Sequence, residues 1–259
     1  MDKVNLSFLI VGGCFPVQDN ISSENLYHAY LSREVKSKYN RCLTVEVVRY
    51  ERFSDCLGNI KKHNENNPMD ILLFHFRSEH FLRLCKLVFR YRSEHNGIKR
   101  TLNMLFCSMS RVEDIDYLAY TGATVRSRKP NQNKFYPVLV AANYLLGFLA
   151  GNVHFALKRY KKLAADIIEF CKEHEIQVLL AGPASRPHTW WENYLTNTIN
   201  RYMKKAFDKS GLSYIELLGT EGEDGKSFFF DNGIQVNESG HRRIAKLIID
   251  GMNFLDISE

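Results

Sequence analysis

Short apolar runs that end abruptly in glycine or in polar residues recur along this chain, and they constrain its fold more than any other feature. Residues 6–11 are apolar apart from one serine and stop at two glycines. Residues 71–76 and 176–181 have the same character. Residues 43–49 are rich in valine and alternate between apolar and polar side chains. Runs of this length indicate β-strands, and strands that are apolar on both faces are typical of parallel sheets.

Segments with helical periodicity separate these runs. The spacing of apolar residues predicts helices over residues 24–38, 153–174 and 190–210, with Ser22 or Ser23 capping the first. A fifth strand is expected at residues 213–217, followed by a last helix through Ile244 and Met252. Alternating strands and helices predict an α/β fold: a three-layer α/β/α sandwich around a five-stranded parallel sheet, in one domain over residues 1–259.

The section from about residue 80 to residue 148 is interpreted as an elaboration on that domain, placed as a cap over the site. Residues 81–92 are periodic enough to predict a helix, Asn96 and Gly97 indicate a turn, and residues 102–107 suit a short strand. Residues 53–60 are expected to form a loop or a short helix. Residues 126–133 are basic and loop-like.

Composition excludes several classes of protein. Hydrophobic residues make up 45% of the 259 residues, which excludes a disordered chain, and a net charge of +6 does not by itself indicate nucleic-acid binding. The six cysteines form no CxxC pair, so a zinc site is not expected. No cofactor is expected either. No run of about 18 apolar residues occurs, so no membrane span is predicted, and a cytoplasmic location is the simplest interpretation.

Cys14 stands where a nucleophile would be placed, directly after the first predicted strand and its two glycines. A nucleophile at a strand end can use backbone N–H groups, including that of Gly13, to hold an oxyanion. A thiolate is a strong nucleophile, but it needs a base or an electropositive setting that lowers the pKa of the thiol. The alternative is that Cys14 is a small, half-buried residue in a tight turn.

The stretch from Asp231 to His241 enters the last helix through a polar turn with two glycines and two asparagines. It resembles the final sequence block of the SGNH (GDSL) hydrolases, Asp-Gly-x-His-x-Asn-x-x-Gly-His. Four residues match that block, and they are Gly233, Asn237, Gly240 and His241. Asn232 stands where the family has its catalytic Asp, and Gln235 stands where it has its catalytic His.

The resemblance extends to the first strand, where Gly12, Gly13 and Cys14 take the places of the family's Gly-Asp-Ser. It implies a flavodoxin-like sandwich and the hydrolysis or transfer of acyl or acetyl esters on small molecules, glycans or lipids, without a metal. In the family two further blocks supply oxyanion donors. Here Glu79 stands in place of the expected Asn, and Asn152 is another candidate donor, with the N-cap of the following helix as its preferred role.

Other polar residues are expected at the same edge of the sheet. Arg77 and Glu79 follow the third strand, and Arg186 and His188 follow the fourth. An arginine there can hold a carboxylate or a phosphate, or it can pair with a neighbouring carboxylate to close the strand end. Basic clusters at residues 83–92, 126–129 and 158–162 are interpreted as solvated faces, and nucleic acid is not expected as a partner.

Two main hypotheses about function follow, and the sequence leaves open which of them holds and whether the chain is an enzyme. In the first, the altered triad Cys14, Asn232 and Gln235 has lost esterase activity, because a carboxamide is not a base, and the old cleft binds a ligand or partner. In the second, Cys14 acts as a nucleophile with another group as base: Asp231, or a histidine such as His75, His80, His188 or His241. A third and weaker hypothesis is a module that binds a phosphorylated or nucleic-acid ligand through Arg77 and Arg186. The oligomeric state is not indicated.

Overall fold

The structure is a computed structural model. It describes residues 5–12, 18, 20–50, 55–77, 81–82, 84–95, 98–105, 136–183, 190–209, 211–217, 221–225, 227–230 and 235–252.

The centre of the fold is the five-stranded parallel sheet that the sequence predicts. Its strands lie in the order β2-β1-β3-β6-β7, and every neighbouring pair is parallel. Their bounds are Asn5–Gly12 for β1, Cys42–Arg49 for β2, Ile71–His75 for β3, Gln177–Ala181 for β6 and Tyr214–Ile215 for β7. The last strand is shorter than expected. The chain adds β2 on one side of β1 and the later strands on the other, so the strand order reverses between β1 and β3. Open α/β sheets bind ligands at such a switch point.

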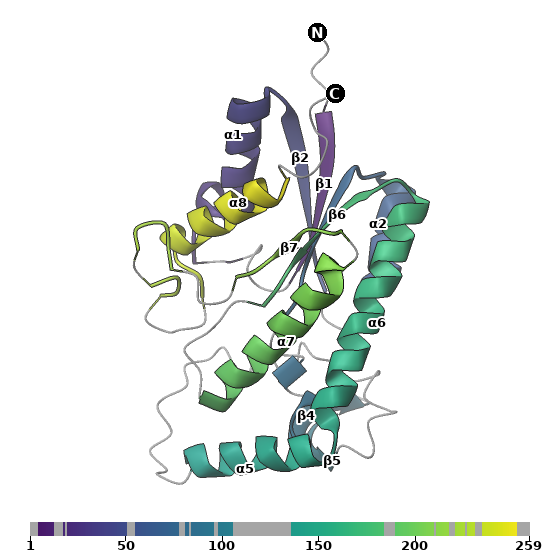
Figure 1. The fold of residues 1–259 in the computed structure, drawn as a ribbon, viewed down its shortest axis with the longest axis vertical. Helices are drawn as coiled ribbons and strands as arrows, with labels where there is room; N and C mark the ends of the chain where they lie inside the picture. Colours follow the sequence, from purple (N-terminus) through teal and green to yellow (C-terminus); the bar gives the residue numbers. More distant parts are fainter. Residues whose placement is uncertain are drawn as a thin grey trace.

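Helices cover both faces of the sheet and complete the predicted three-layer sandwich (Figure 1). One face carries α1 (Tyr27–Tyr39) and α8 (Glu238–Met252). The other carries α2 (Cys56–Asn66), α6 (Asn152–Glu173) and α7 (Trp190–Asp208). A 3₁₀ turn over Ser23–Asn25 precedes α1, and Leu26 occupies the N-cap of α1, so the expected capping of that helix by Ser22 or Ser23 is wrong.

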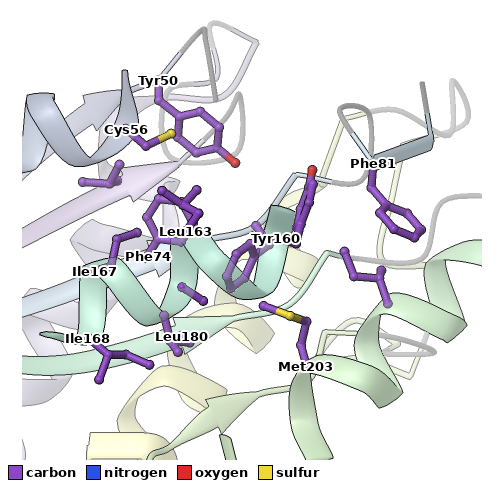
Figure 2. Packing of buried hydrophobic residues seen from close by; sticks show 14 of the residues in the cluster. Tyr50, Cys56, Phe74, Phe81, Tyr160, Leu163, Ile167, Ile168, Leu180 and Met203 are labelled. Atoms are coloured by element: carbon purple, nitrogen blue, oxygen red, sulfur yellow. The ribbon is translucent and has the colours of Figure 1, made fainter. Parts of the chain in front are cut away.

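Strand alternation divides the buried side chains into two cores. In β1, Phe8 and Ile10 point toward α1 and α8, whereas Leu9 and Val11 point toward α2 and α6. Figure 2 shows the second core, in which Phe74 of β3 and Leu180 of β6 lie among Leu163, Ile167 and Tyr160 of α6. Strands with two apolar faces are necessary here because helices cover both sides.

The middle section differs from the sequence prediction. Phe81, Leu82 and Leu84 are helical, but the helix expected over residues 81–92 is wrong, because β4 (Val88–His95) follows. It pairs antiparallel with β5 (Ile98–Leu105), which begins four residues earlier than predicted. The alternation of aromatic and polar residues from Phe89 to Ser93 favours a strand, and the Asn96-Gly97 dipeptide suits the turn of a hairpin.

The helix α5 (Tyr136–Leu149) was not anticipated at all, because a segment that is apolar on every side gives no helical periodicity. It lies at one end of the molecule, beyond the sheet, and α6 rises away from it (Figure 1). In the part of the chain that the structure describes, no helix is both long enough and apolar enough to cross a membrane.

Candidate functional site at the carboxyl edge of the sheet

The sequence-predicted site residues lie in different kinds of element: His75 ends β3, whereas Asn152 and His241 lie in the helices α6 and α8. Five of those residues are described: His75, Arg77, Asn152, Gln235 and His241. The others lie outside the described residues, and these are Gly13, Cys14, Glu79, His80, Arg186, His188, Asp231 and Asn232.

Gln18 joins the segment that follows β1 to the segment that precedes α8. Its side-chain Nε2 donates to the carbonyl oxygen of Val236 at 2.7 Å, and its Oε1 accepts from the backbone N–H of Val236 at 3.2 Å. Only 6% of Gln18 is exposed. This pair of hydrogen bonds holds Gln18, four positions after Cys14 in the sequence, against Val236, the residue after Gln235.

Gln235 is held at the end of a narrow loop. The backbone N–H of Phe230 donates to the carbonyl oxygen of Gln235 at 2.9 Å, and Phe229 forms an antiparallel bridge with Val236. The four residues 231–234 therefore connect two positions whose backbones are hydrogen-bonded to each other. The Gln235 side chain is half-buried. A carboxamide at this position can donate and accept hydrogen bonds, but it cannot take up a proton near neutral pH.

Asn237 and Gly240, which match the family block, have structural tasks. The Asn237 Oδ1 accepts from the backbone N–H of Gly240 at 2.8 Å, which makes Asn237 the N-cap of α8. Its Nδ2 donates to the carbonyl oxygen of Ser227 at 2.7 Å. Gly240 lies against the carbonyl oxygen of Phe228 and the side chain of Val236, where no Cβ would fit.

His241, the third matching residue that is described, lies in the interior between α8 and α1. Its Nδ1 accepts from the backbone N–H of Tyr27 at 3.3 Å, and its ring stacks on the Tyr27 ring with centroids 6.0 Å apart. Burial, with a smaller contribution from His28, lowers the pKa of His241 to about 4. The ring is fully buried, and its Nε2 has no hydrogen-bond partner among the described atoms. The imidazole of His241 is neutral and enclosed between α8 and the start of α1, which supports a structural task and not that of a general base.

His75 has a different setting, at the last position of β3. Its neighbour Phe74 is in register with Val11, so His75 lies one position further along, beside Gly12 at the end of β1. On its other side it is in register with Ala181 of β6. Only 3% of His75 is exposed. Of the two described histidines that the sequence suggested as a base, His75 is therefore the one next to the strand that leads to Cys14.

Arg77 is built into the strand ends. Its Nη1 donates to the carbonyl oxygen of Tyr50 at 3.2 Å, and its guanidinium lies 5.8 Å from the centroid of the Tyr50 ring. Its backbone N–H donates to the Tyr50 hydroxyl at 3.1 Å, and its carbonyl accepts from the Tyr160 hydroxyl at 2.8 Å. The side chain is buried, with 7% exposed. These contacts connect β2, β3 and α6 around a buried cation.

Asn152 is the first residue of α6 and not its N-cap, which is Gly151 with φ of 81°. The interpretation of Asn152 as the N-cap of α6 is therefore wrong. Gly151 takes that position in the αL conformation, which suits glycine. The Asn152 Nδ2 donates to the carbonyl oxygen of Lys86 at 2.8 Å, so the side chain ties α6 to the segment before β4.

Three of the four described cysteines are poor nucleophiles. Cys56, Cys85 and Cys171 are buried, and burial raises the pKa of each thiol, to about 12 for Cys171. Cys42 is half-buried in β2. Within the described residues, no group of three or more His, Cys, Asp or Glu side chains is arranged to hold a metal ion.

Sequence reasoning missed Gln18, Tyr50 and Tyr160. The Tyr160 ring packs in the core (Figure 2), and its hydroxyl donates to the carbonyl oxygen of Arg77, two residues past the end of β3. Tyr50 immediately follows a predicted strand, which is a signal that was available. Nothing in the sequence near Gln18 indicates that its partner lies 218 positions away.

Comparison with solved structures identifies the architecture. No protein-family model and no curated protein sequence matches the chain. A G-D-S-L family lipolytic protein from Veillonella parvula superposes with a TM-score of 0.55 at 10% identity, over 95% of this chain and 98% of that one. A lipase/acylhydrolase from Enterococcus faecalis gives 0.54 at 10% identity, over 95% of both chains. A catalytic mutant of the acetylxylan esterase Axe2 from Geobacillus stearothermophilus gives 0.51 at 10% identity, over 98% and 97%. The chain therefore has the fold of the SGNH (GDSL) hydrolases.

Proposed function

We propose that this chain is an SGNH-fold protein that binds an acyl-ester-type ligand at the carboxyl edge of its sheet and has lost hydrolysis by the usual triad. The observation that carries the proposal is Gln235, which stands at the position of the family's catalytic histidine. The loop before α8 is closed by the Phe230–Gln235 and Gln18–Val236 hydrogen bonds, which supports a fixed position for this side chain.

The division of tasks among the block residues supports the same proposal. Asn237, Gly240 and His241 cap, pack and fill the interface between α8 and its neighbours, and all three are retained. The exchanged positions, Asn232 and Gln235, are those whose proton chemistry the reaction needs. Retention of the structural residues with exchange of the chemical ones is what a binding protein on an old hydrolase fold requires.

The test is an esterase assay with p-nitrophenyl acetate and p-nitrophenyl butyrate. The wild-type chain is expected to show no turnover above background, and saturation-transfer NMR is expected to show the intact butyrate ester bound. Turnover that disappears in Cys14→Ala would contradict the loss of activity. Absence of any NMR signal for the ester would contradict the binding part.

A gain-of-function variant tests the assignment of positions. The triple substitution Cys14→Ser, Asn232→Asp and Gln235→His restores the family's triad residues, and it is expected to hydrolyse p-nitrophenyl acetate at least about tenfold faster than wild type. The matched control carries Asn232→Asp and Gln235→His with Cys14→Ala, which leaves no nucleophile. Equal rates for the two variants would show that these positions do not converge.

The position of His75 favours a second candidate function, a thiol-dependent acyl hydrolase or acyltransferase with Cys14 as nucleophile. Its place beside Gly12 puts an imidazole at the strand end from which the chain continues to Cys14 two residues later. A neutral imidazole there can accept the thiol proton and raise the fraction of thiolate.

Iodoacetamide labelling separates the two candidates. The thiol mechanism predicts that Cys14 is labelled faster than the other cysteines, with an apparent pKa below about 8, and that His75→Asn slows the labelling. The buried thiols of Cys56, Cys85 and Cys171 serve as internal references. Labelling of Cys14 no faster than that of Cys42, and unaffected by His75→Asn, would rule this mechanism out.

A further inference from the structure

The helix α5 exposes apolar side chains over most of its surface. Its sequence, Tyr136–Leu149, contains no charged residue. Leu149 is 71% exposed, Val138 is 64% exposed and Leu139 is 62% exposed. These three residues, together with Leu145, Leu146 and Phe148, form the α5 surface. A helix on the outside of a protein in water normally carries polar residues on its outer face, so this surface indicates an apolar partner.

A narrow strip on the opposite side fixes α5 to the rest of the protein. Gly147 packs directly on the backbone of Cys85, where no Cβ would fit, and the N–H of Leu87 donates to the carbonyl oxygen of Asn143 at 3.2 Å. The Tyr144 hydroxyl donates to the Glu192 carboxylate of α7 at 3.0 Å. The described contacts that hold α5 are therefore these hydrogen bonds, the close approach at Gly147 and the buried ring of Tyr144, whereas the side chains of the α5 surface face outward.

Exposed aromatic side chains lie on the first turns of α7, the part of that helix that contacts α5 through Glu192. Trp190, at the start of α7, is 68% exposed and stacks on Tyr194, which is also exposed. The Tyr144–Glu192 hydrogen bond places this end of α7 against α5, and the two helix ends lie close together in Figure 1. Exposed tryptophan and tyrosine are the residues that concentrate at the headgroup level of membranes.

A band of positive charge lies near the start of α6, the helix that follows α5. Lys158, Arg159, Lys161 and Lys162 follow within the first three turns of α6, and three of them are exposed. No Asp or Glu occurs from residue 136 to residue 165. Because α6 rises away from α5, Lys158 lies about 9 Å along the helix axis from Asn152. Helical side chains lean toward the N-terminus, so these lysines lean toward the α5 end.

We propose that this end of the protein binds the surface of an anionic membrane, with the α5 surface inserted among the upper acyl chains and the band Lys158–Lys162 against the lipid phosphates. The distance from α5 to the basic residues along α6 is comparable to the thickness of a lipid headgroup layer. A second protein copy would also cover the apolar side chains, but it would leave the basic bands of both copies without an anionic partner. The inference does not depend on the chemistry at Cys14.

Vesicle co-sedimentation tests the proposal. The wild-type chain is expected to bind phosphatidylcholine vesicles that contain roughly a third phosphatidylserine, and to bind pure phosphatidylcholine vesicles at least about tenfold more weakly. The variant Leu146→Ser/Leu149→Ser, at two exposed positions, is expected to lower binding at least about tenfold. The variant Lys158→Gln/Lys162→Gln is expected to lower it about 25-fold, at about fivefold for each charge.

The matched control is Lys36→Gln/Lys205→Gln, which removes the same charge from exposed positions on α1 and α7 and is expected to bind like wild type. Circular dichroism and urea unfolding establish that each variant is folded. Failure of the wild type to sediment with anionic vesicles overturns the proposal, as does equal binding to neutral vesicles or equal binding by the leucine variant. Concentration-dependent dimers that the leucine variant abolishes, without vesicle binding, overturn it in favour of self-association.

Discussion

Protonation of His241 is expected to make the stability of this protein depend on pH in a way that one substitution removes. Its pKa is about 4 in the folded chain, against about 6.5 in an unfolded one. The unfolded chain therefore takes up a proton that the folded chain refuses as the pH falls from 6.5 to 4. Stability is lost over that window, by about 2 kcal/mol between pH 7 and pH 5 and by about 3 kcal/mol below pH 4.

The measurement is urea unfolding at pH 7 and at pH 5, for wild type and for His241→Asn. Asparagine places a carboxamide oxygen near the position of Nδ1, so it can still accept from the Tyr27 N–H, and it carries no titrating group. The smaller side chain costs about 2 kcal/mol at both pH values. The loss of stability between pH 7 and pH 5 is expected to be about 2 kcal/mol smaller in the variant than in wild type.

The matched control is His154→Asn, at an exposed position on α6, which is expected to keep the pH dependence of wild type. Equal slopes of urea response in all three proteins are needed for the comparison. If His241→Asn loses as much stability between pH 7 and pH 5 as wild type does, then His241 is not kept neutral by its surroundings, and the structural task assigned to it is refuted.

Three further substitutions test the contacts around the site. Gln18→Ala removes both hydrogen bonds to Val236 and is expected to lower the free energy of unfolding by about 2 kcal/mol in urea titration; no change would mean that the two segments are not held together by this residue. Tyr160→Phe leaves the carbonyl of Arg77 without its donor at unchanged volume and is expected to cost about 1 to 2 kcal/mol, whereas Tyr202→Phe, at an exposed position, is expected to cost almost nothing. Gly147→Ala forces α5 away from Cys85 and is expected to increase trypsin cleavage near α5. The control Ala142→Gly, on the exposed side of α5, is expected to change cleavage little. Equal cleavage rates for the two variants would contradict the close packing at Gly147.

The sheet could be predicted because each strand carries its own evidence. β1, β3 and β6 are buried on both faces, so an uninterrupted apolar run is itself the signal, and the helical stripes of α6 and α7 follow from burial on one side. α5 could not be found in this way, because its apolar residues do not mark one face. The segment that follows Phe81 was misassigned because a few apolar residues suit both periods, and tertiary pairing with β5 decided in favour of a strand.

The site was predictable only as far as local sequence determines it. Asn237, Gly240 and His241 were singled out because they match the family block, and the structure shows them as a cap, a close approach and a buried ring within five residues. The contacts of Arg77 with Tyr50 and Tyr160 join three separate elements, and single-sequence patterns contain no information about such pairings. The same holds for His75, whose position next to β1 follows from the strand order and not from its neighbours in the chain.

The hydrogen bonds between Gln18 and Val236 also determine when the site can form during synthesis. The two residues are separated by 218 positions, and the packing of α1 on α8 spans a similar interval. A chain emerging from the ribosome can pair β1 with β2 and β3 early, but the edge near β1 stays open until residue 236 has emerged. A nascent chain arrested before α8 would therefore have most of the sheet and expose the apolar face that α8 covers, with no assembled site. Holdase chaperones are expected to engage the nascent chain during that interval.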